Sequence, residues 1–278
     1  MKSIVQIHKV QSLSLPELQP YRTLRRPVEH IKQGIFIAEG EKVVRRLLAS
    51  GLDVVSLLVT PEWYGQLHTS KELERGHPLR IYIADKELLE TIVGYNLHQG
   101  IMGVARVPEQ SPENDFLQSL NKNHFLVALD GLVNSENVGV VVRNCAAFGV
   151  DALIVGETSS SPYLRRAVRN SMGTVFQLPV LHVSHLATTL MDLRRIHGTR
   201  AIAAHPQERS SIDNGNFRGN VCVVFGNEGD GISQVILNAC TERVAIPMMN
   251  GTDSLNVASA SAVFLYEANK QRRVLHVG

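Results

Sequence analysis

The chain has 278 residues, a length that one hydrophobic core rarely covers, so two domains are expected. Its apolar content of 44% and charged content of 19% are ordinary and exclude a disordered or low-complexity protein. The formal net charge of +2 is too small to indicate a nucleic-acid-binding protein by itself, and no apolar run approaches the length of a membrane span.

The cysteines and the N-terminal residues indicate the compartment. Cys145, Cys222 and Cys240 are isolated, with no CxxC spacing and no nearby pair of histidines. They are predicted to be small buried residues of a reducing compartment, forming neither a metal site nor a disulfide. Residues 1–10 lack the core of a signal peptide. A cytoplasmic location is therefore expected.

The first hundred residues predict a small α/β domain. Residues 1–20 are weakly patterned and are expected to form an arm at most. Arg22, Arg25 and Arg26 then cluster, either on a solvent-exposed helix face or as contacts to RNA phosphates. Apolar patterning predicts alternating strands and helices after this cluster. They are a strand at 36–40, a helix at 42–50, strands at 54–60 and 79–84, a helix at 86–93 and a strand at 101–107.

A domain boundary is predicted next. Pro108 to Asn114 is rich in proline and polar residues, as in a linker. The first domain is expected at residues 1–108, the linker at 109–116 and the second domain at 117–278. The second domain opens with an apolar strand at His124–Leu129 and a helix at Val138–Phe148, with Asn137 as the expected N-cap. A strand at 152–155 completes a βαβ unit.

Arginines recur in the helices of the second domain. Arg143 lies among apolar residues, so it is either a surface arginine with a buried stem or a functional group facing a pocket. Residues 163–172 predict a helix on which Arg165, Arg166 and Arg169 form a positive ridge. Further strands are predicted at 175–180, 200–204 and 221–225, and a helix at 186–197.

Two loops near the C-terminus carry unusual residues. Residues 226–233 contain three glycines in the spacing GxxGxG, which is neither the dinucleotide fingerprint nor a Walker loop. Glu228 in this loop either caps a helix or faces a substrate. A strand at 244–246 precedes the second loop, and a helix extending to about Arg273 follows it, with Asp253 or Ser254 as the expected cap. Asn256 suggests a polar entrance to that helix.

Three polar loops thus follow predicted strands, at residues 134–137, 226–233 and 248–256. In open α/β sheets, ligands bind outside the carboxyl ends of the strands. In this order and spacing the loops resemble the SpoU (TrmH-like) family of RNA ribose 2′-O-methyltransferases, within the SPOUT superfamily. The resemblance covers most of residues 124–273 and has three motifs. They are Asn134-Ser135-Glu136-Asn137-Val138-Gly139 with Arg143, Phe225 to Ser233, and Ile246-Pro247-Met248 with Ser254-Leu255-Asn256-Val257.

The resemblance implies an α/β fold, with a SPOUT-type parallel sheet flanked by helices and a C-terminal trefoil knot. It also implies a preceding small α/β substrate-binding domain of ribosomal-protein-like fold, a weaker likeness carried by Phe36–Gly40 and Gln99-Gly100. The methyl donor would be S-adenosylmethionine, the substrate ribosomal or transfer RNA, and the assembly a homodimer whose active site borrows residues across the interface. No metal and no membrane are expected.

The family's functional residues are carried over by position. Polar side chains would surround the ribose and form the catalytic group: Asn134, Arg143, Glu228, Ser254 and Asn256. Residues of the second and third motifs would bind the donor: Gly226, Ile246, Met248 and Leu255. Basic side chains would position the RNA backbone: Arg22, Arg25, Arg26, Arg165, Arg166 and Arg169.

The chain departs from the family pattern at Ser135, where proline is common, and at Asn144, where threonine is common. Because a guanidinium stays protonated, Arg143 is expected to bind the target phosphate and stabilise negative charge on the 2′-oxygen, while phosphate or water takes the proton. Glu228 would hold Arg143 or a partner asparagine in place. His205 is a further candidate for the base.

Two other functions are compatible with parts of the pattern. One is a catalytically silent RNA-binding protein of the same fold, although arginine, glutamate and asparagine stand at the motif positions. The other is a nucleotide-dependent oxidoreductase, which the missing dinucleotide fingerprint disfavours.

Overall fold

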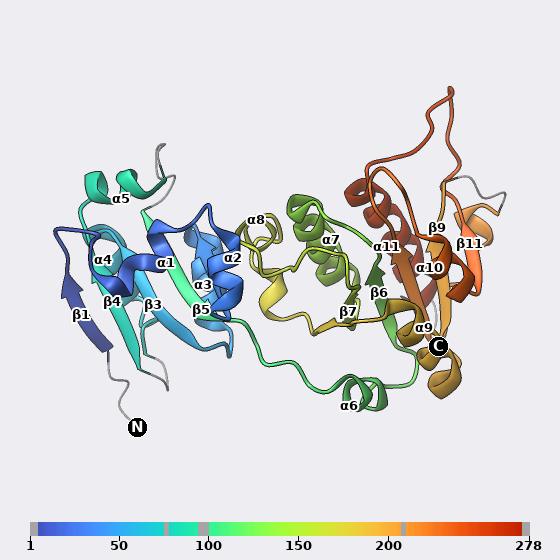
Figure 1. Cartoon of the computed structure of the whole chain (residues 1–278), viewed down its shortest axis with the longest axis horizontal. Coiled ribbons are helices and arrows are strands. Elements are labelled where there is room, and N and C mark those ends of the chain that lie inside the picture. The colour runs from blue at the N-terminus through green and yellow to red at the C-terminus, as the bar shows by residue number, and fades with distance from the viewer. Residues whose placement is uncertain (1–4, 75–77, 94–99, 207–209, 274–278) are drawn as a thin grey trace. The chain divides into compact units, whose positions relative to one another are not determined.

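The computed structural model describes residues 5–74, 78–93, 100–206 and 210–273, so that Gln99 lies outside the described residues. The chain divides into two compact units (Figure 1). The first ends at Glu109 and also contains Tyr163–Phe176, and the second contains Gln110–Pro162 and the chain from Gln177 onward. The division after Glu109 falls in the predicted linker. The membership of Tyr163–Phe176 in the first unit differs from the prediction.

A mixed sheet with the strand order β1-β4-β3-β5-β2 forms the centre of the first unit. Strands β1, β4 and β3 are parallel, and β5 is antiparallel to both of its neighbours. All of these strands except β1 are predicted by the sequence. Strand β1 is an edge strand whose residues are mostly exposed, so it lacks the apolar pattern of a buried strand. The strands are β1 Val5–Lys9, β2 Ile35–Glu39, β3 Val54–Val59, β4 Leu79–Ile83 and β5 Ile101–Arg106.

The residues expected to form an N-terminal arm are instead part of the first unit from Val5 onward. Leu18 and Tyr21 are fully buried, and the Tyr21 and Ser56 hydroxyls share a hydrogen bond of 2.9 Å. The prediction of an arm is therefore wrong for the described part of residues 1–20. The helices of this unit are η1 Pro16–Leu18, α1 Gln19–Arg22, α2 Pro27–Lys32, α3 Glu41–Ala49, α4 Pro61–Thr69, α5 Lys86–Val93, α8 Arg165–Asn170 and η2 Thr174–Phe176.

Aromatic contacts hold the Tyr163–Phe176 segment in the first unit. The ring of Phe36 lies 5.5 Å from the rings of both Tyr163 and Phe176, measured between centroids. Helix α8 is shorter than the predicted helix at 163–172. The predicted strand at 175–180 is wrong, because residues 174–176 form a 3₁₀ turn that buries Phe176 against the first unit. The next strand begins only at Val180.

The second unit contains a sheet with the strand order β11-β9-β10-β6-β7-β8, in which every described strand pair is parallel. Helix α6 begins inside the predicted linker, which is therefore partly helical. The strands are β6 Phe125–Leu129, β7 Ala152–Val155, β8 Val180–His182, β9 Arg200–Ala204, β10 Val221–Phe225 and β11 Glu242–Val244. The helices are α6 Glu113–Gln118, α7 Ser135–Phe148, α9 Leu186–His197, η3 Ile212–Asn214, α10 Gln234–Ala239 and α11 Val257–Arg273.

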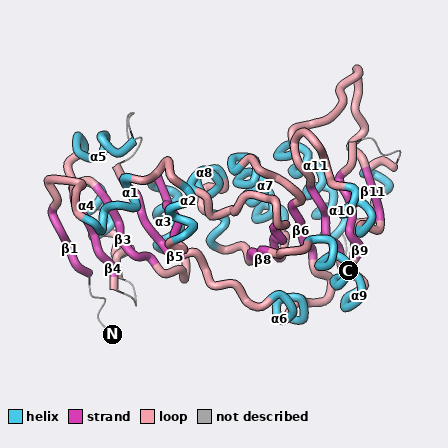
Figure 2. The backbone as a smooth tube through the Cα atoms, viewed as in Figure 1, coloured by secondary structure: helices cyan, strands magenta, loops and turns pink. Residues whose placement is uncertain are grey.

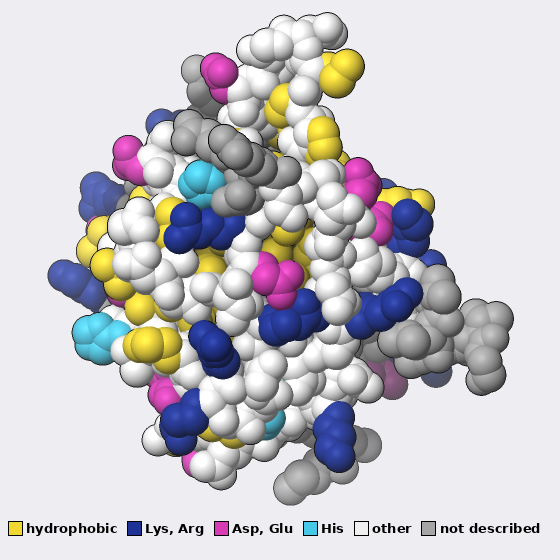
Figure 3. All heavy atoms as spheres, turned by 90° about the vertical axis from the view of Figure 1, so that its right-hand side faces the viewer, with side chains coloured by type: hydrophobic (Ala, Val, Ile, Leu, Met, Phe, Trp, Pro, Cys, Tyr) yellow, Lys and Arg dark blue, Asp and Glu magenta, His cyan; other side chains and the backbone are white. Residues whose placement is uncertain are grey.

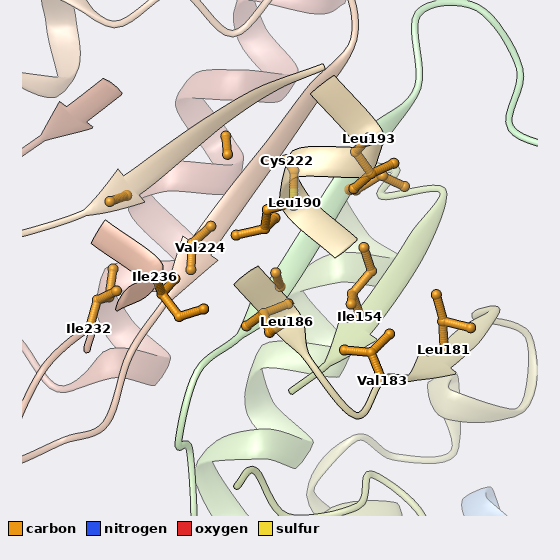
Figure 4. Close-up of a cluster of buried hydrophobic side chains, with 14 of the residues drawn as sticks. Ile154, Leu181, Val183, Leu186, Leu190, Leu193, Cys222, Val224, Ile232 and Ile236 are labelled. Atoms are coloured by element: carbon orange, nitrogen blue, oxygen red, sulfur yellow. The ribbon is translucent and has the colours of Figure 1, made fainter. Parts of the chain in front are cut away.

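Helices cover both faces of this sheet (Figures 1 and 2). On one face, Val224 and Ile154 pack with Leu190 of α9 and Ile236 of α10 in a buried cluster (Figure 4). On the other face, Phe225 lies 5.8 Å from Phe264 of α11, ring centroid to ring centroid. Successive side chains of a strand point to opposite faces, so the apolar strands supply both cores. Within the described residues, each helix is too short or too polar to cross a membrane. The threading of the C-terminal segment as a knot stays a prediction.

His124, directly before β6, makes stability depend on pH. Its Nδ1 lies 3.0 Å from the Asn121 carbonyl and its Nε2 lies 2.8 Å from the Thr199 hydroxyl, and the residue is buried. Burial lowers the pKa of His124 below its ordinary value of 6.5. The unfolded chain therefore binds the proton more readily than the folded chain does. The free energy of unfolding should fall as pH drops from 7 through the folded-state pKa.

Urea unfolding between pH 7.5 and pH 5 checks this expectation. His124→Gln should flatten the decline, whereas the exposed control His185→Gln should keep the wild-type slope. Some slope should remain in both variants, because burial also lowers the pKa of His30 and His182. Equal slopes in wild type and His124→Gln would contradict the assignment.

Candidate active site

Three neighbouring strands of the second unit end at one edge of the sheet. Phe225 of β10 pairs with Leu129 of β6, and Val224 of β10 pairs with Ala203 of β9. Because the strands are parallel, the chain leaves all three on the same side. The loops after them carry the residues of the first and second motifs and His205. The segment from β11 to α11 carries the third motif and extends as a long loop (Figure 1).

Asn134 begins helix α7. Its side-chain oxygen accepts hydrogen bonds from the backbone N–H groups of Glu136, at 2.9 Å, and Asn137, at 3.4 Å. The helix therefore starts at Ser135, and the prediction of Asn137 as the N-cap is wrong. Gly149 ends the helix, since it has a left-handed backbone with φ 74°. Asn134 is an exposed capping residue, and Asn137 has its side chain available for other contacts.

Asn137 connects the loops of the other two motifs. Its Nδ2 donates to Oε1 of Glu228 at 2.8 Å, and its Oδ1 accepts from Nδ2 of Asn256 at 3.5 Å. Glu228 and Asn256 were among the predicted site residues, whereas Asn137 was predicted only as a helix cap. The sequence contained one signal for Asn137. Because Asn134 already caps the helix, the carboxamide of Asn137 is free to donate one hydrogen bond and accept another from residues outside the helix. We call these three side chains the polar network.

The glycine loop after β10 is closed tightly on itself. A Cβ atom on Gly226 would lie 2.3 Å from the carbonyl carbon of Gly231, so only glycine fits. Asn227 and Gly231 exchange backbone hydrogen bonds of 2.8 and 3.1 Å, and Nδ2 of Asn227 donates to the Gly131 carbonyl at 2.7 Å. The Ser233 N–H donates to Asp130 at 2.7 Å. These bonds fix the glycine loop against the loop that follows β6.

The third loop is anchored where α11 begins. Asn256 is the capping residue, because its Oδ1 accepts from the Ala258 N–H at 2.9 Å, and the expected caps Asp253 and Ser254 are wrong. Nδ2 of Asn144 donates to the Ala258 carbonyl at 3.0 Å and to the Ser261 hydroxyl at 2.9 Å. The asparagine that departs from the family pattern thus joins α7 to the first turn of α11.

The loops that follow β9 and β10 and the segment between β11 and α11 line a cavity of about 280 Å³. Apolar side chains such as Phe264 and Val257 form part of its wall, and Asn256 and Glu228 lie at its polar side. All four predicted donor-binding residues line this cavity: Gly226, Ile246, Met248 and Leu255. Ser254 also lines it, whereas Asn134 and Arg143 do not.

The cavity has the character of a nucleoside site, with apolar walls, exposed loop backbone and a few convergent polar groups. Its wall includes Gly226, Gly229 and Gly231 of the glycine loop, so main-chain groups form part of the lining. On the face shown in Figure 3, hydrophobic side chains lie at the bottom of a hollow with charged side chains beside it. These residues therefore fit S-adenosylmethionine, whose adenosine is largely apolar and whose sulfonium is cationic.

Arg143 stands apart from the cavity. It is exposed on α7 and makes no hydrogen bond or ion pair with any described residue of its own chain. Glu228 therefore holds Asn137, not Arg143, within this chain.

Both predicted basic clusters lie in the first unit, because α8 belongs to it. Arg22 and Arg169 are exposed. Arg25, Arg26 and Arg166 are also exposed, and Arg26 pairs with Glu29 at 3.1 Å. Arg165 differs from the others, since its guanidinium is half-buried and pairs with Glu39 at 2.6 Å. This contact gives Arg165 a role in holding α8 on β2.

Metal and thiol chemistry have few candidate residues. The described residues contain no group of three His, Cys, Asp or Glu side chains placed to hold a metal ion. Cys145 and Cys222 are buried as predicted, whereas Cys240 is only partly buried, and the three thiols are free in the described residues. Burial raises the pKa of the Cys145 and Cys222 thiols, so they stay protonated and unreactive.

Comparison with known proteins gives the same assignment as the motifs. Residues 124–266 match the SpoU rRNA Methylase family, and residues 37–111 match the family described as RNA 2′-O ribose methyltransferase substrate binding. An uncharacterized tRNA/rRNA methyltransferase of Mycobacterium tuberculosis (strain H37Rv) is 33% identical over 95% of this chain and 91% of its own length. The 23S rRNA (guanosine-2′-O-)-methyltransferase RlmB of Acinetobacter baylyi is 30% identical over 84% of this chain and 96% of its own.

The fold also matches solved structures. The AdoMet-bound rRNA methyltransferase of Sinorhizobium meliloti superimposes with a TM-score of 0.81, at 24% identity, over 95% of this chain and 98% of that one. At this identity the likeness shows the fold alone. The family matches set aside both the silent RNA-binding protein and the nucleotide-dependent oxidoreductase. The chain belongs to the SpoU rRNA methylase family and is an enzyme that transfers a methyl group from S-adenosylmethionine to a ribose 2′-hydroxyl of RNA.

Proposed function

We propose that this enzyme methylates a ribose in ribosomal RNA, with the polar network of Asn137, Glu228 and Asn256 positioning the reacting groups. The observation that carries the proposal is the meeting of these three side chains beside the cavity lined by Gly226, Ile246 and Leu255. The relative from Acinetobacter baylyi, which is named as acting on 23S rRNA, aligns with 84% of the chain and supports this substrate. Methylation of ribosomal RNA would also be consistent with a cytoplasmic location.

The network fixes the orientation of one carboxamide. Because Glu228 accepts from Nδ2 of Asn137, Oδ1 of Asn137 faces Asn256, and neither amide can turn over without losing a bond. Bound S-adenosylmethionine supplies a methyl group on a sulfonium, and a ribose 2′-oxygen must approach it in line. Side chains held in one orientation can place that oxygen without reorganisation during the reaction. Ser254, on the same cavity wall, adds a hydroxyl that can bind the ribose.

Arg143 supplies the positive charge beside the target phosphate. It lies six residues after Asn137 on α7, so the two side chains are separated by about 9 Å along the helix and about 120° around it. They therefore leave the helix in different directions, and Arg143 is not among the residues that line the cavity of its own chain. The 2′-hydroxyl proton passes to water or to the RNA phosphate, because a guanidinium cannot accept it.

A second copy of the chain brings Arg143 to the site. Helices α7 and α11 pack together through Asn144 and Ser261, and they leave Ala147, Val263 and Tyr266 exposed on their outer face. Val263 is 38% exposed and Tyr266 is 60% exposed, and apolar side chains on one face are typical of an interface. We infer that this face pairs with its counterpart in a homodimer in which each Arg143 serves the partner's cavity.

The arginines of the first unit bind the RNA backbone. Arg22 and Arg169 are exposed and have no hydrogen bond or ion pair with described residues. Arg25, Arg26 and Arg166 extend the same basic surface. Arg165 contributes mainly by holding α8 in place through Glu39. This unit therefore supplies affinity for structured RNA, while the cavity supplies the chemistry.

The test of the function is a map of ribose 2′-O-methylation across stable RNAs in a strain that lacks the gene. One site in ribosomal RNA should lose its methyl group, and wild-type protein should restore it. Glu228→Gln should restore less than about a tenth, because a neutral amide oxygen accepts from Asn137 more weakly than the carboxylate does and the amide can also turn its Nε2 toward Asn137. Asp230→Asn removes a charge from the same exposed loop and should restore methylation fully. Loss from transfer RNA alone would overturn the proposed substrate.

Substitution of basic residues should change how salt affects binding. In Arg22→Ala with Arg169→Ala, affinity for protein-free ribosomal RNA should fall. The slope of log affinity against log salt should become shallower by about 1 for each phosphate that the variant no longer neutralises. Filter binding between 50 and 200 mM salt, as an approximate range, measures both effects. Arg194→Ala, an exposed arginine of α9, is the matched control and should keep the wild-type slope. An unchanged slope in the double variant would remove these residues from the RNA-binding surface.

Mixing two inactive variants tests the shared site. Arg143→Ala and Glu228→Gln should each be inactive alone. Dimers that contain one copy of each keep one intact site, so random mixing should restore about a quarter of wild-type turnover. Adding Tyr266→Asp to both should abolish the restoration, whereas Met191→Asp, at another exposed apolar residue, should not. Mixed dimers without restored activity would show that Arg143 serves its own chain.

A further inference from the structure

His205 carries a buried nitrogen that nothing in the fold satisfies. The residue follows β9 directly, and its backbone N–H donates to the Val244 carbonyl at 3.0 Å. The side chain is partly buried, and its Nδ1 is enclosed with no hydrogen-bond partner. Among the side chains that the structure describes, it is the one buried nitrogen or oxygen in this condition. A buried polar atom without a partner destabilises a fold, so an unsatisfied one calls for an explanation.

Other buried imidazoles of the chain are satisfied. Both ring nitrogens of His124 have partners, and Nε2 of His30 lies 3.0 Å from the Thr23 hydroxyl. His205 is therefore an exception within this protein. The residue lines the cavity together with Gly226, Ile246 and Leu255, all of which belong to the motifs. Nδ1 itself is shielded from water in the chain alone, so a ligand in that cavity can supply its missing partner when the ring turns toward it.

The place of His205 in the sheet indicates which part of the ligand it meets. Strand β9 lies on one side of β10, and β6 lies on the other. The polar network depends on Asn137, which comes from the helix after β6, so it lies toward the β6 side of the glycine loop. His205 enters the cavity from the opposite side, where Ala245 and Ile246 follow β11. This arrangement separates His205 from the ribose hydroxyl that is to be methylated and argues against its being the base.

We propose that Nδ1 of His205 binds the adenosine part of S-adenosylmethionine, by a hydrogen bond to the adenine ring edge or to a ribose hydroxyl of the donor. The proposal explains why the atom is enclosed but has no partner in the chain alone. It makes His205 a donor-binding residue that no motif identifies. The apolar walls beside it strengthen such a bond, because they keep water from competing for the nitrogen.

Calorimetry with S-adenosylhomocysteine tests the proposal on the full chain. His205→Ala should bind about five- to tenfold more weakly, the effect of one missing hydrogen bond. His205→Asn places a polar atom at the position of Nδ1 and should stay within about twofold of wild type, whereas His205→Gln places it at the position of Nε2 and should resemble alanine. His185→Ala, an exposed histidine of the same unit, is the control and should bind as wild type does.

Two further measurements separate binding from other roles. Without ligand, His205→Ala should melt at or above the wild-type temperature, since an unsatisfied buried atom is removed. At saturating donor, its single-turnover methyl transfer should remain near the wild-type rate. Unchanged affinity in His205→Ala would overturn the proposal. So would a lower melting temperature with equally weakened affinity in all three variants, or a rate loss of about a hundredfold with affinity intact, which would indicate a base.

Analogues of the ligand locate the bond. If the adenine amino group is the partner, wild type and His205→Ala should bind S-inosylhomocysteine equally well, because the analogue lacks that amine. If a ribose hydroxyl is the partner, the corresponding deoxy analogue should remove the difference instead. If a ring nitrogen is the partner, the corresponding deaza analogue should remove the difference. A difference that persists with all of these analogues would show that the adenosine is not what His205 contacts.

Discussion

The alignment of β6, β9 and β10 is the constraint on which the site depends. Parallel pairing sets Phe225 opposite Leu129 and Val224 opposite Ala203, so three neighbouring strands deliver their loops at one level of one edge. Each parallel strand must be reached through a crossover connection, and residues far apart in the sequence therefore meet at this edge. The polar network can form because the segments that follow β6, β10 and β11 meet at this edge and carry Asn137, Glu228 and Asn256.

Hydrogen bonds to main-chain groups hold the loops after β6 and β10 against each other. Asn227 donates to the Gly131 carbonyl, and Asp130 accepts from the Ser233 N–H, so the loops after β6 and β10 are joined. Gly226 allows the backbone to fold back upon Gly231 without a side chain between them. A cavity bounded by such a loop presents fixed N–H and C=O groups to its ligand. This use of the backbone explains why the donor-binding motifs contain so few side chains with evident chemistry.

The sequence predicted the elements whose apolar pattern is strong. Helix α9 and strands β7, β9 and β10 begin and end where the pattern indicated. Strand β1 was missed because an exposed edge strand has no buried apolar pattern. Residues 175–176 were predicted as part of a strand because they are apolar. Their apolar character instead reflects the packing of Phe176 on Phe36, a long-range contact that the local sequence cannot show. The same limit explains why residues 163–176 were assigned to the second domain.

The loops that meet beside the cavity were predicted from the sequence, but the asparagine that joins them was not. The motifs identified these loops, yet the roles of Asn134 and Asn137 depend on where α7 begins. The sequence alone does not show which of two asparagines three residues apart caps the helix. Once Asn134 is the cap, its side chain is committed to the helix, and Asn137 becomes the residue that can join Glu228 and Asn256. The polar atom missing from the motifs, Nδ1 of His205, had no sequence signal, because a histidine after a strand is unremarkable until its surroundings are known.

Polar groups that have no hydrogen-bond partner within the chain indicate where another molecule can bind. The chain satisfies its buried imidazoles at His30 and His124 and pairs Arg165 with Glu39, so it forms hydrogen bonds readily where structure needs them. In the second unit, the guanidinium of Arg143 and Nδ1 of His205 are two groups that receive no such partner from the described residues. Arg143 is exposed on α7, and His205 is a residue that lines the cavity beside the glycine loop. Such groups are candidates for contact with a second molecule, and the partners proposed above are a second subunit for Arg143 and the methyl donor for His205.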